Sequence, residues 1–348
     1  MNVKKALITG ITGQDGYYLT CLLLQKGYAV HGIARRNGRQ ALGALEELSS
    51  QDRERLTIHW GDVTDASFIE QVIRKGVFNE IYHLAAQSFV PQSFTNSYST
   101  YQVNITGTLH VLNAIRDASP ETRMYHAATS EMYGLAQQMP QTEQTPFYPR
   151  SPYGISKLAA FWMVKSYRES YGLFATNGIL FNHESELRNP EFVTQKIAAA
   201  VALIVRGKQD VLELGNLDAK RDWGYAPEYV EGAWRMLQQS KADDYVLATG
   251  EHHTIREFVE RAFAHVDLPI RWEGEGLEEV GVTKKTAQIV VRINPVFYRP
   301  AEVPDLLGDS TKARTELGWV PKTSFDEIVR KMIVYHTSPS KEDILTSC

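Results

Sequence analysis

The sequence predicts an α/β fold, in which helices wrap a doubly wound parallel sheet and a smaller mixed α/β domain follows. In the first half, short β-branched or apolar runs alternate with amphipathic helical stretches. A glycine-rich turn separates the first of these runs from the first helix. After residue 181 the alternation stops. These three observations indicate a nucleotide-binding half that is completed by a second, less regular part.

Six apolar runs predict the strands of the sheet, at residues 6–9, 29–34, 56–60, 80–85, 124–127 and 175–181. Between the first two, Leu19, Leu22 and Leu23 lie on one face of a helix that Gly27 ends. The result is a βαβ unit of about thirty residues, the size typical of a dinucleotide-binding fold. The sequence therefore favours a Rossmann-type sheet.

The irregular second part begins with a polar stretch, 182–191, followed by a helix expected at 192–206. We expect a cofactor-binding domain over residues 1–181 plus about 224–250. A substrate-binding domain is expected over about 182–223 and 251–348. The Gly- and Glu-rich stretch 273–281 predicts a mobile loop, and the polar tail from His336 is expected to fray.

Composition excludes several classes of protein. The 348 residues with 43% apolar content can bury a sizeable core, and 37 Lys+Arg against 41 Asp+Glu give a net charge of −4. This balance predicts no binding of nucleic acid or of anionic membranes. Cys21 and Cys348 match neither a disulfide framework nor a zinc site, so we expect reduced thiols and no metal. Without a signal sequence or a bilayer-spanning run, the expected location is the cytoplasm.

The loop after the first strand is the predicted cofactor site. Glycines allow a tight turn and close approach of a pyrophosphate, while backbone N–H groups at the start of the helix hold the phosphates. The G-x-x-G-x-x-G spacing differs from the commoner G-x-G-x-x-G, but the flanking strand and helix favour this function over a simple turn. The loop residues expected at the cofactor are Gly10, Thr12, Gly13, Gln14, Asp15 and Gly16.

The second strand ends in Arg35 and Arg36, where an NAD-selective protein carries Asp or Glu. Two guanidinium groups suit a 2′-phosphate, so the sequence predicts NADP; solvated arginines are the alternative. Asp62 and Val63, after the third strand, are placed to meet the adenine. The residues after the fourth strand are expected along the inner face of the cofactor, namely Leu84, Ala85, Ala86, Gln87 and Ser88.

Tyr153 and Lys157 form the predicted oxidation pair. Chance alone predicts about one Tyr-x-x-x-Lys in this chain, so its location after the fifth strand carries the information. Residues four apart share a helix face, so Lys157 can hold the cofactor ribose while its charge favours the Tyr153 phenolate. Thr129, at the end of the fifth strand, can hydrogen-bond the same sugar hydroxyl.

Glu131 changes the predicted class of reaction. Once a sugar C4 hydroxyl is a ketone, the C5 proton is acidic, and a carboxylate can remove it while the C6 hydroxyl leaves as water. Hydride returned to C6 regenerates the cofactor. Oxidation followed by elimination is thus predicted; a Glu131 that caps a helix or faces solvent is the alternative.

Several longer strings resemble the GDP-mannose 4,6-dehydratases, a branch of the extended short-chain dehydrogenase/reductases. They cover residues 10–16, 129–134, 145–154, 182–185, 215–224 and 298–303. The resemblance implies tightly held NADP, a GDP-sugar substrate, a 4-keto-6-deoxy product and a homodimer or homotetramer. It implies catalytic Thr129, Glu131 and Tyr153, and cofactor contacts from Lys157, His183 and Arg188. The implied substrate contacts are Ser88, Ser130, Asn182, Val193, Lys196, Arg221, Arg299 and Glu302.

The chain departs from this family at a few positions. Asn37-Gly38 replace serines after the paired arginines, Glu186-Leu187-Arg188-Asn189-Pro190 replaces Pro-Arg-Arg-Gly, and Gln195 replaces an arginine. Because Glu186 and Gln195 are expected near the substrate pocket, a GDP-heptose stays open as an alternative to GDP-mannose. A nucleotide-sugar epimerase or reductase, and a non-catalytic NADP-sensing protein, are further alternatives.

Overall fold

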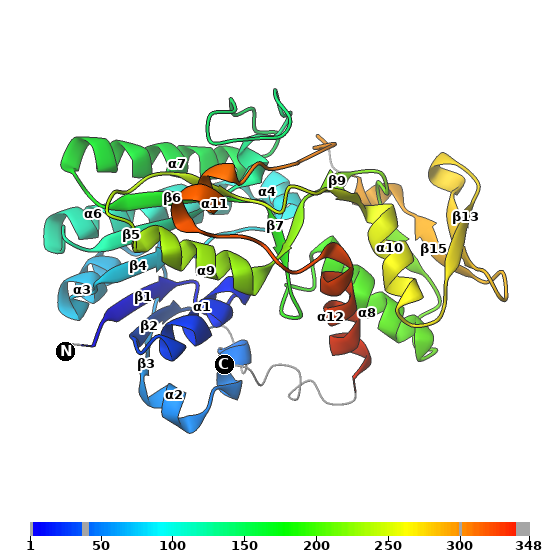
Figure 1. Cartoon of the computed structure of the whole chain (residues 1–348), viewed down its shortest axis with the longest axis horizontal. Coiled ribbons are helices and arrows are strands. Elements are labelled where there is room, and N and C mark those ends of the chain that lie inside the picture. The colour runs from blue at the N-terminus through cyan, green and yellow to red at the C-terminus, as the bar shows by residue number, and fades with distance from the viewer. Residues whose placement is uncertain (1–2, 37–41, 299–300, 339–348) are drawn as a thin grey trace.

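A computed structural model describes residues 3–36, 42–298 and 301–338 (Figure 1). Its centre is a seven-stranded sheet in the order β11-β6-β5-β4-β1-β2-β3, with every neighbouring pair parallel. The chain order reverses between β1 and β4, and at this switch point an open α/β sheet forms its binding crevice. The strands are β1 (Lys5–Thr9), β2 (Ala29–Ala34), β3 (Leu56–Trp60), β4 (Glu80–His83), β5 (Arg123–Thr129), β6 (Ala175–Leu180) and β11 (Tyr245–Leu247).

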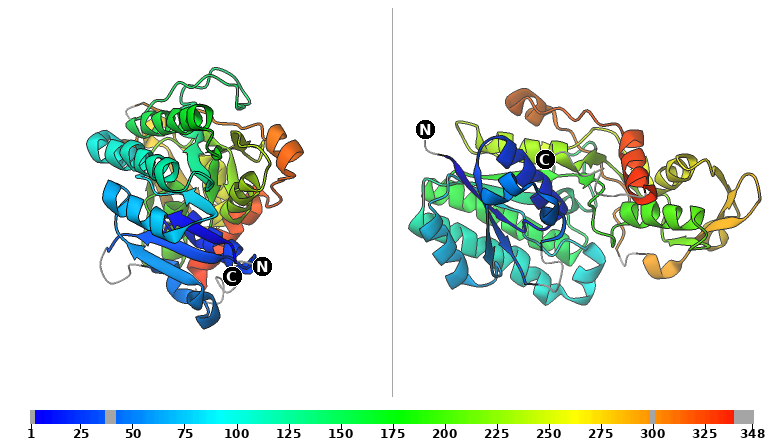
Figure 2. Two further views of the ribbon diagram at one scale, coloured as in Figure 1. Left: turned by 90° about the vertical axis from the view of Figure 1, so that its left-hand side faces the viewer. Right: turned by 90° about the horizontal axis from the view of Figure 1, so that it is seen from below.

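Helices cover both faces of this sheet, as the view from below in Figure 2 shows. Side chains alternate along β1: Ala6 and Ile8 join the core under α1 and α9, whereas Leu7 joins the core under α3 and α6. One layer contains α1 (Gln14–Gln25), α9 (Ala226–Leu237) and α11 (Thr311–Leu317). The other contains α3 (Ala66–Gly76), α6 (Gly107–Ala118) and α7 (Pro152–Tyr171). Shorter elements are η2 (Gly43–Glu47), α2 (Ser50–Glu54), α4 (Val90–Thr95), α5 (Ser97–Tyr101), η3 (Gln102–Thr106) and η4 (Ser130–Met132).

The remaining elements build a second body beside the carboxyl edge of the sheet (Figure 1). A four-stranded sheet in the order β13-β14-β15-β8 packs with three helices around Val201, Phe258 and Ile328. Its strands are β8 (Leu212–Leu214), β13 (Ile270–Glu273), β14 (Val280–Thr283) and β15 (Ile289–Ile293), and its helices α8 (Val193–Val205), α10 (Ile255–Ala264) and α12 (Phe325–Thr337). Two two-stranded sheets connect the bodies. One pairs β7 (Asn182–Glu184) with β10 (Trp223–Tyr225), and the other pairs β9 (Lys220–Arg221) with β12 (His253–Thr254). The remaining short helices are η5 (Gly276–Glu278) and η6 (Pro295–Phe297).

All six predicted strands are confirmed within two residues at either end, and the helix predicted at 192–206 is α8. The loop predicted at 273–281 is confirmed over 274–279, which connect β13 to β14, and is wrong at its ends. Trp272 pairs with Gly281 and Glu273 with Val280, so only the turn between β13 and β14 has the predicted character. The expected thiol at Cys21 is also wrong, because this cysteine is disulfide-bonded. Cys348, Asn37 and Gly38 lie outside the described residues.

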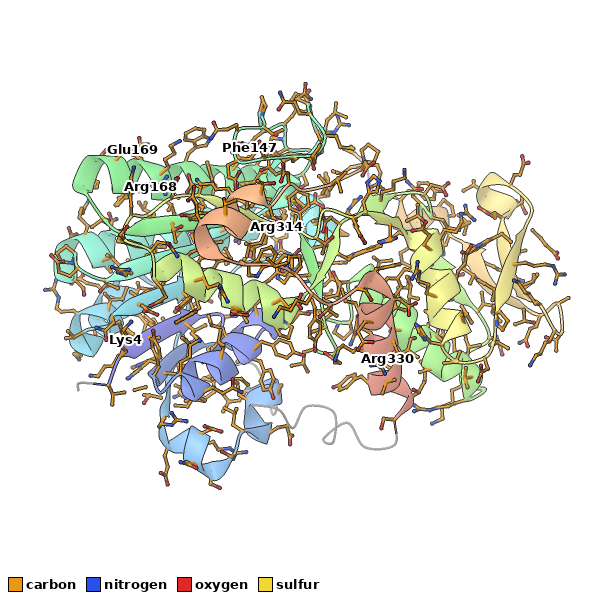
Figure 3. The ribbon with its side chains drawn as sticks, in the orientation of Figure 1. Lys4, Phe147, Arg168, Glu169, Arg314 and Arg330 are labelled. Atoms are coloured by element: carbon orange, nitrogen blue, oxygen red, sulfur yellow. The ribbon has the colours of Figure 1, made fainter. Side chains whose placement is uncertain are left out.

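A polar cluster closes the amino edge of the sheet, opposite the crevice. Glu80 at the start of β4 is buried and accepts hydrogen bonds from Tyr28, at 3.0 Å, and Tyr82, at 2.7 Å. Lys4, labelled in Figure 3, lies 3.3 Å from the same carboxylate. Because every member has a partner, this buried carboxylate has a structural explanation.

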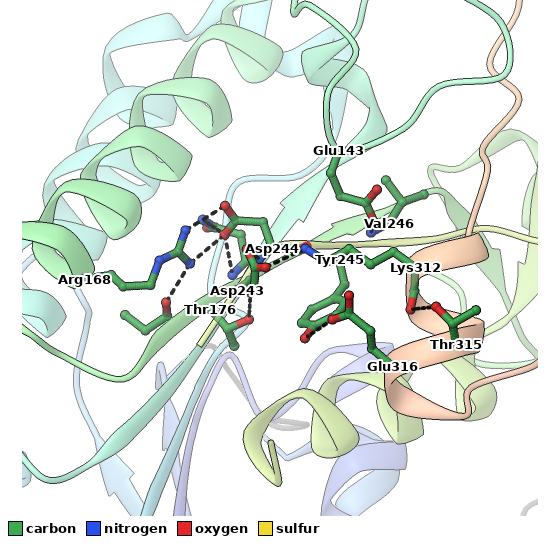
Figure 4. A network of polar contacts seen from close by, with 12 residues as sticks. Glu143, Arg168, Thr176, Asp243, Asp244, Tyr245, Val246, Lys312, Thr315 and Glu316 are labelled. Carbon is green, nitrogen blue, oxygen red and sulfur yellow. Dashed lines mark hydrogen bonds and ion pairs between the residues drawn. The ribbon is translucent and has the colours of Figure 1, made fainter. Parts of the chain in front are cut away.

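A buried ion pair fixes the residue before β11 to α7 (Figure 4). Arg168 donates from both terminal nitrogens to Asp244, at 2.9 and 2.8 Å, and Asn177 donates to the same carboxylate at 2.9 Å. Removing one partner of a buried pair leaves the other charge uncompensated. We expect Asp244→Asn to lower the free energy of unfolding by about 3–5 kcal/mol in urea titrations. Glu70→Gln, which breaks the exposed pair with Arg74, should leave the midpoint nearly unchanged; equal losses would contradict this assignment.

Candidate active site

A cavity of about 910 Å³ lies at the carboxyl edge of the seven-stranded sheet, between the sheet and α8, β8 and β9. This volume is in the range of small-molecule sites. Loops that follow β1, β2, β3, β4 and β5 all contribute to its lining. Parallel strands end at the same edge, and this brings together residues that are distant in the sequence.

The glycine-rich loop fits a pyrophosphate. Gly10 has φ +73°, and a Cβ there would lie 2.9 Å from the Ala85 backbone. A Cβ on Gly16 would lie 2.4 Å from the Ile11 carbonyl oxygen. Gly13 is the N-cap of α1 and has no side chain that could bond the first N–H groups of this twelve-residue helix. Gly13 and the first residues of α1 border the cavity. Backbone donors at a helix start suit an anion. Thr12, Gln14 and Asp15 line the same wall.

The two arginines after β2 differ in placement. Arg35 lines the cavity, whereas the Arg36 guanidinium lies 5.9 Å from the centroid of the Trp60 ring. Asp62 lines the cavity too, and its Oδ1 accepts from the backbone N–H of Thr64 at 2.9 Å. The structure thus brings one of the two predicted phosphate-binding arginines to the site. The cavity also includes Val63, Leu84, Ala85, Ala86, Gln87 and Ser88, as predicted.

The predicted catalytic residues meet where β5 ends and α7 begins. Thr129 Oγ1 accepts from the backbone N–H of Glu131 at 3.2 Å, which starts η4. A Cβ on Gly154 would lie 2.7 Å from the Glu131 carbonyl oxygen, so α7 approaches this turn closely. Tyr153 and Lys157, on the first turns of α7, line the cavity with Glu131. Glu131 is 7% exposed, which rules out the alternative of a solvent-facing side chain.

Burial sets the protonation states of the Tyr153 and Lys157 pair. It raises the pKa of the Tyr153 phenol to about 12, although a hydrogen bond with Thr129 works in the opposite direction and Glu131 adds to the rise. It lowers the pKa of Lys157 to about 8, and Lys157 Nζ donates to the Ala127 carbonyl at 2.7 Å. In the chain alone the phenol keeps its proton at neutral pH, and the expectation that the charge of Lys157 favours the phenolate stays a prediction. Desolvation disfavours the phenolate more than nearby groups favour it.

His183 and Asp15 join β7 to the glycine-rich loop. His183 Nε2 lies 2.8 Å from Asp15 Oδ2 and Nδ1 lies 2.8 Å from the Phe181 carbonyl oxygen, so both ring nitrogens face acceptors. Burial opposes the charge on His183, but Asp15 raises the pKa of the imidazole above its ordinary value. Burial likewise opposes the charge on Asp15, but His183 lowers the pKa of its carboxyl. Each member of the pair therefore favours the charged form of the other.

Three cationic side chains from the second half of the chain, Arg188, Lys196 and Arg221, line the cavity. Arg221 donates to the Val303 carbonyl at 2.8 Å and lies 3.5 Å from Glu302. Lys196 Nζ lies 3.4 Å from the centre of the Phe297 ring, and burial lowers its pKa. Arg188 lies 3.1 Å from Glu184, its guanidinium 3.8 Å from the Phe192 ring. Ser88, Ser130, Asn182, Val193 and Glu302 complete the predicted substrate contacts on the lining, while Arg299 lies outside the described residues.

The two departures expected near the substrate pocket, Glu186 and Gln195, are next to lining residues in the chain but do not lie on the wall. Within the described ranges, neither Glu186 nor Gln195 lines the cavity. Glu186 accepts from Tyr18 and Tyr225 behind the wall, and Gln195 donates to the Glu186 carbonyl oxygen at 3.1 Å. Sequence reasoning also missed five aromatic lining residues, Phe89, Phe181, Phe192, Trp223 and Phe297. The position of Phe89 directly after Ser88 was a usable signal; Phe297 comes to the site only through the fold.

The sheet, the glycine-rich loop and the Tyr153–Lys157 pair define an extended short-chain dehydrogenase/reductase. Solved structures share this fold: UDP-glucose 4-epimerase from Bifidobacterium longum, in complex with NAD+ and UDP, has a TM-score of 0.81 at 22% identity and covers 97% of this chain and 100% of its own. The dTDP-glucose 4,6-dehydratase from Bacillus anthracis has a TM-score of 0.77 at 21% identity, covering 96% of both chains.

The chain belongs to the GDP-mannose 4,6 dehydratase family, whose sequence profile matches residues 7–332. The GDP-mannose 4,6 dehydratase of Drosophila melanogaster is 51% identical over 95% of this chain and 85% of its own. That of Sinorhizobium fredii is 51% identical over 95% of both, and that of Homo sapiens 49% identical over 94% of this chain and 90% of its own. In the described part of the chain, no group of three or more His, Cys, Asp or Glu residues could hold a metal ion, and no helix could cross a membrane.

Proposed function

We propose that this protein is a hydro-lyase that converts GDP-mannose to GDP-4-keto-6-deoxymannose, with NADP as a bound catalyst. The observation that carries the proposal is the buried Glu131 in one cavity with Thr129, Tyr153 and Lys157. A second base beside the oxidation pair is needed for elimination and not for epimerisation or reduction alone. The relatives that are 49–51% identical over 94–95% of this chain are named GDP-mannose 4,6-dehydratases, and this supports the same activity.

Each residue of this group has a separate role in the proposed dehydration. Tyr153, supported by Thr129, removes the proton of the C4 hydroxyl, and Lys157 orients the cofactor ribose. When bound, NADP would supply the hydride acceptor at C4 and the hydride donor at C6. Glu131 removes the C5 proton and passes a proton to the departing C6 hydroxyl, which leaves as water. One water is lost and the cofactor ends in its starting state, so no external reductant is consumed.

The alternatives have less support. The argument for a GDP-heptose depended on Glu186 and Gln195 in the sugar pocket, and neither lines the cavity. Epimerisation or reduction alone would give the buried Glu131 no role in the reaction. A non-catalytic NADP-sensing protein would give no chemical role to the group formed by Thr129, Glu131, Tyr153 and Lys157.

The proposal has a direct test. We expect purified protein incubated with GDP-mannose, without added cofactor or after reloading with NADP, to give a product lighter by one water in mass spectrometry. GDP-heptose and UDP-glucose serve as parallel substrates. Turnover of GDP-heptose in place of GDP-mannose would overturn the sugar assignment, and epimerisation without loss of water would overturn the reaction class.

The choice of NADP over NAD is supported by Arg35, which borders the cavity after β2. A guanidinium stabilises a 2′-phosphate that NAD lacks. We expect Arg35→Ala to weaken NADP binding by about 10-fold or more in calorimetry, the effect of one charge-assisted contact, and to leave NAD binding nearly unchanged. Arg36→Ala, the matched control, should have the smaller effect because Arg36 lies against Trp60. Equal affinities for both cofactors in the parent protein would contradict the assignment.

We also propose the remaining organisation of the molecule. The expected domain division is residues 1–181 plus 224–250 against 182–223 plus 251–348. Separate cores around the two sheets support two domains, but Ala313, Leu317 and Trp319 pack in the core under α1 and α9, so we assign α11 to the cofactor-binding domain. The resemblance to the family favours a homodimer or homotetramer, and a cytoplasmic location stays a prediction. Light scattering of the purified chain distinguishes the two assemblies.

A further inference from the structure

The segment 183–186 connects the cofactor loop to the substrate wall of the cavity. Gln14 donates to the His183 carbonyl at 3.1 Å, and Ser185 donates to the Gln14 side chain at 2.7 Å. His183 also pairs with Asp15. Each of these contacts reaches the first turn of α1, where the phosphates of a dinucleotide would bind. Directly after the segment, the wall begins: Leu187, Arg188, Asn189, Glu191, Phe192, Val193, Thr194 and Lys196 all line the cavity.

Glu186 is the last residue of this segment, and it contacts three elements, α1, β10 and α8. Its Oε2 accepts from Tyr18 of α1 at 3.0 Å, and both carboxylate oxygens lie 3.3 Å from the Tyr225 hydroxyl at the end of β10. Its backbone oxygen accepts from Gln195 of α8. Glu186 is only 5% exposed. A carboxylate at this depth is retained only where hydrogen bonds compensate its desolvation.

The two tyrosines act as donors to this carboxylate. Burial, followed by the charge of Glu186, raises the pKa of the Tyr18 and Tyr225 phenols. Both hydroxyls therefore keep their protons throughout the ordinary pH range. A glutamine at 186 would offer one acceptor oxygen and would turn an N–H donor toward one of the phenols. The contact thus depends on the carboxylate and not only on the size of the side chain.

We propose that Glu186 is a positioning residue that couples cofactor binding at α1 to substrate affinity at the wall 187–196. Binding of a dinucleotide fixes the first turns of α1. Tyr18 and Glu186 pass this ordering to the wall, which includes Lys196, one of the predicted substrate contacts. Cofactor and GDP-sugar then bind more tightly together than separately, and by linkage each strengthens the other by the same factor. The identity of the ligands rests on the proposed function.

The test measures this factor without turnover. The dissociation constant of GDP is determined by calorimetry with and without saturating NADP. We expect NADP to tighten GDP binding by about 5- to 150-fold in the parent protein. Tyr18→Phe and Glu186→Gln should each lower that factor by more than about twofold, and the double variant should lose no more than either alone, because the contacts of Gln14 with this segment remain. Tyr225→Phe, which removes the other hydroxyl but not the link to α1, should keep the factor within about twofold of the parent value.

Turnover gives a second readout. For Tyr18→Phe we expect a higher KM for GDP-mannose with kcat close to the parent value, because the reacting groups are untouched. No coupling in the parent protein, coupling retained in Tyr18→Phe, or equal loss in Tyr225→Phe would each overturn the inference. If Glu186→Gln does not fold, the coupling factor measured in Tyr18→Phe alone tests the inference. Coupled binding of GDP and NADP without any conversion of GDP-mannose would overturn the proposed function and leave this inference standing.

Discussion

Glu131→Gln is expected to abolish loss of water, with a fall in kcat of about 10²- to 10⁴-fold, the contribution of a positioned general base. Glutamine keeps the size of the side chain and its place after Thr129, but it cannot accept the C5 proton. Tyr153 and Lys157 are unchanged, so oxidation at C4 should continue. The variant should hold bound cofactor in its reduced form during incubation with GDP-mannose.

Mass spectrometry measures loss of water, and the absorbance of the reduced nicotinamide follows the oxidation step. Glu191→Gln is the matched control, because Glu191 also lines the cavity but belongs to the wall before α8. A Glu131→Gln protein that dehydrates GDP-mannose at the parent rate would show that another group removes the C5 proton. Loss of both signals would instead mean that Glu131 is needed for binding or for the fold of η4.

Tyr153→Phe is expected to remove the first step itself, again by about 10²- to 10⁴-fold, since no base remains for the C4 hydroxyl. Here the reduced cofactor should not accumulate. The two variants therefore separate oxidation from elimination by opposite results in the nicotinamide absorbance.

The pH dependence of the oxidation step follows from the same residue. The pKa of Tyr153 is raised to about 12 in the chain alone, so the phenolate is scarce at neutral pH. Since the deprotonated form is the base, the step should accelerate as pH rises toward the pKa of Tyr153 in the complex. A bound nicotinamide cation and a charged Lys157 would lower that pKa. We expect the rising limb in stopped-flow measurements of the parent protein and its loss in Tyr153→Phe; a flat parent profile would assign the proton to another group.

Much of this site could be predicted because it depends on local pattern and on one topological rule. The strand before Gly10 and the helix after Gly16 are evident from the order of apolar residues. In a parallel sheet the carboxyl ends of strands lie together, so Thr129 and Arg35 could be placed at one edge. The hairpin at 270–283 could not be predicted from its Gly- and Glu-rich turn. Trp272 holds it through contacts with Glu260 and Arg256 of α10, which no local pattern reveals.

The sequence by itself determined the sheet, the cofactor loop and the group Thr129, Glu131, Tyr153 and Lys157, because these follow from periodicity and spacing along short stretches. Only the tertiary structure decided on which side of the wall Glu186 lies and how strongly Tyr153 holds its proton. Both depend on the surroundings of a side chain. Glu186 faces away from the cavity because Tyr18 and Tyr225, far away in the sequence, surround its carboxylate. Tyr153 holds its proton because the assembled walls exclude water from the phenol.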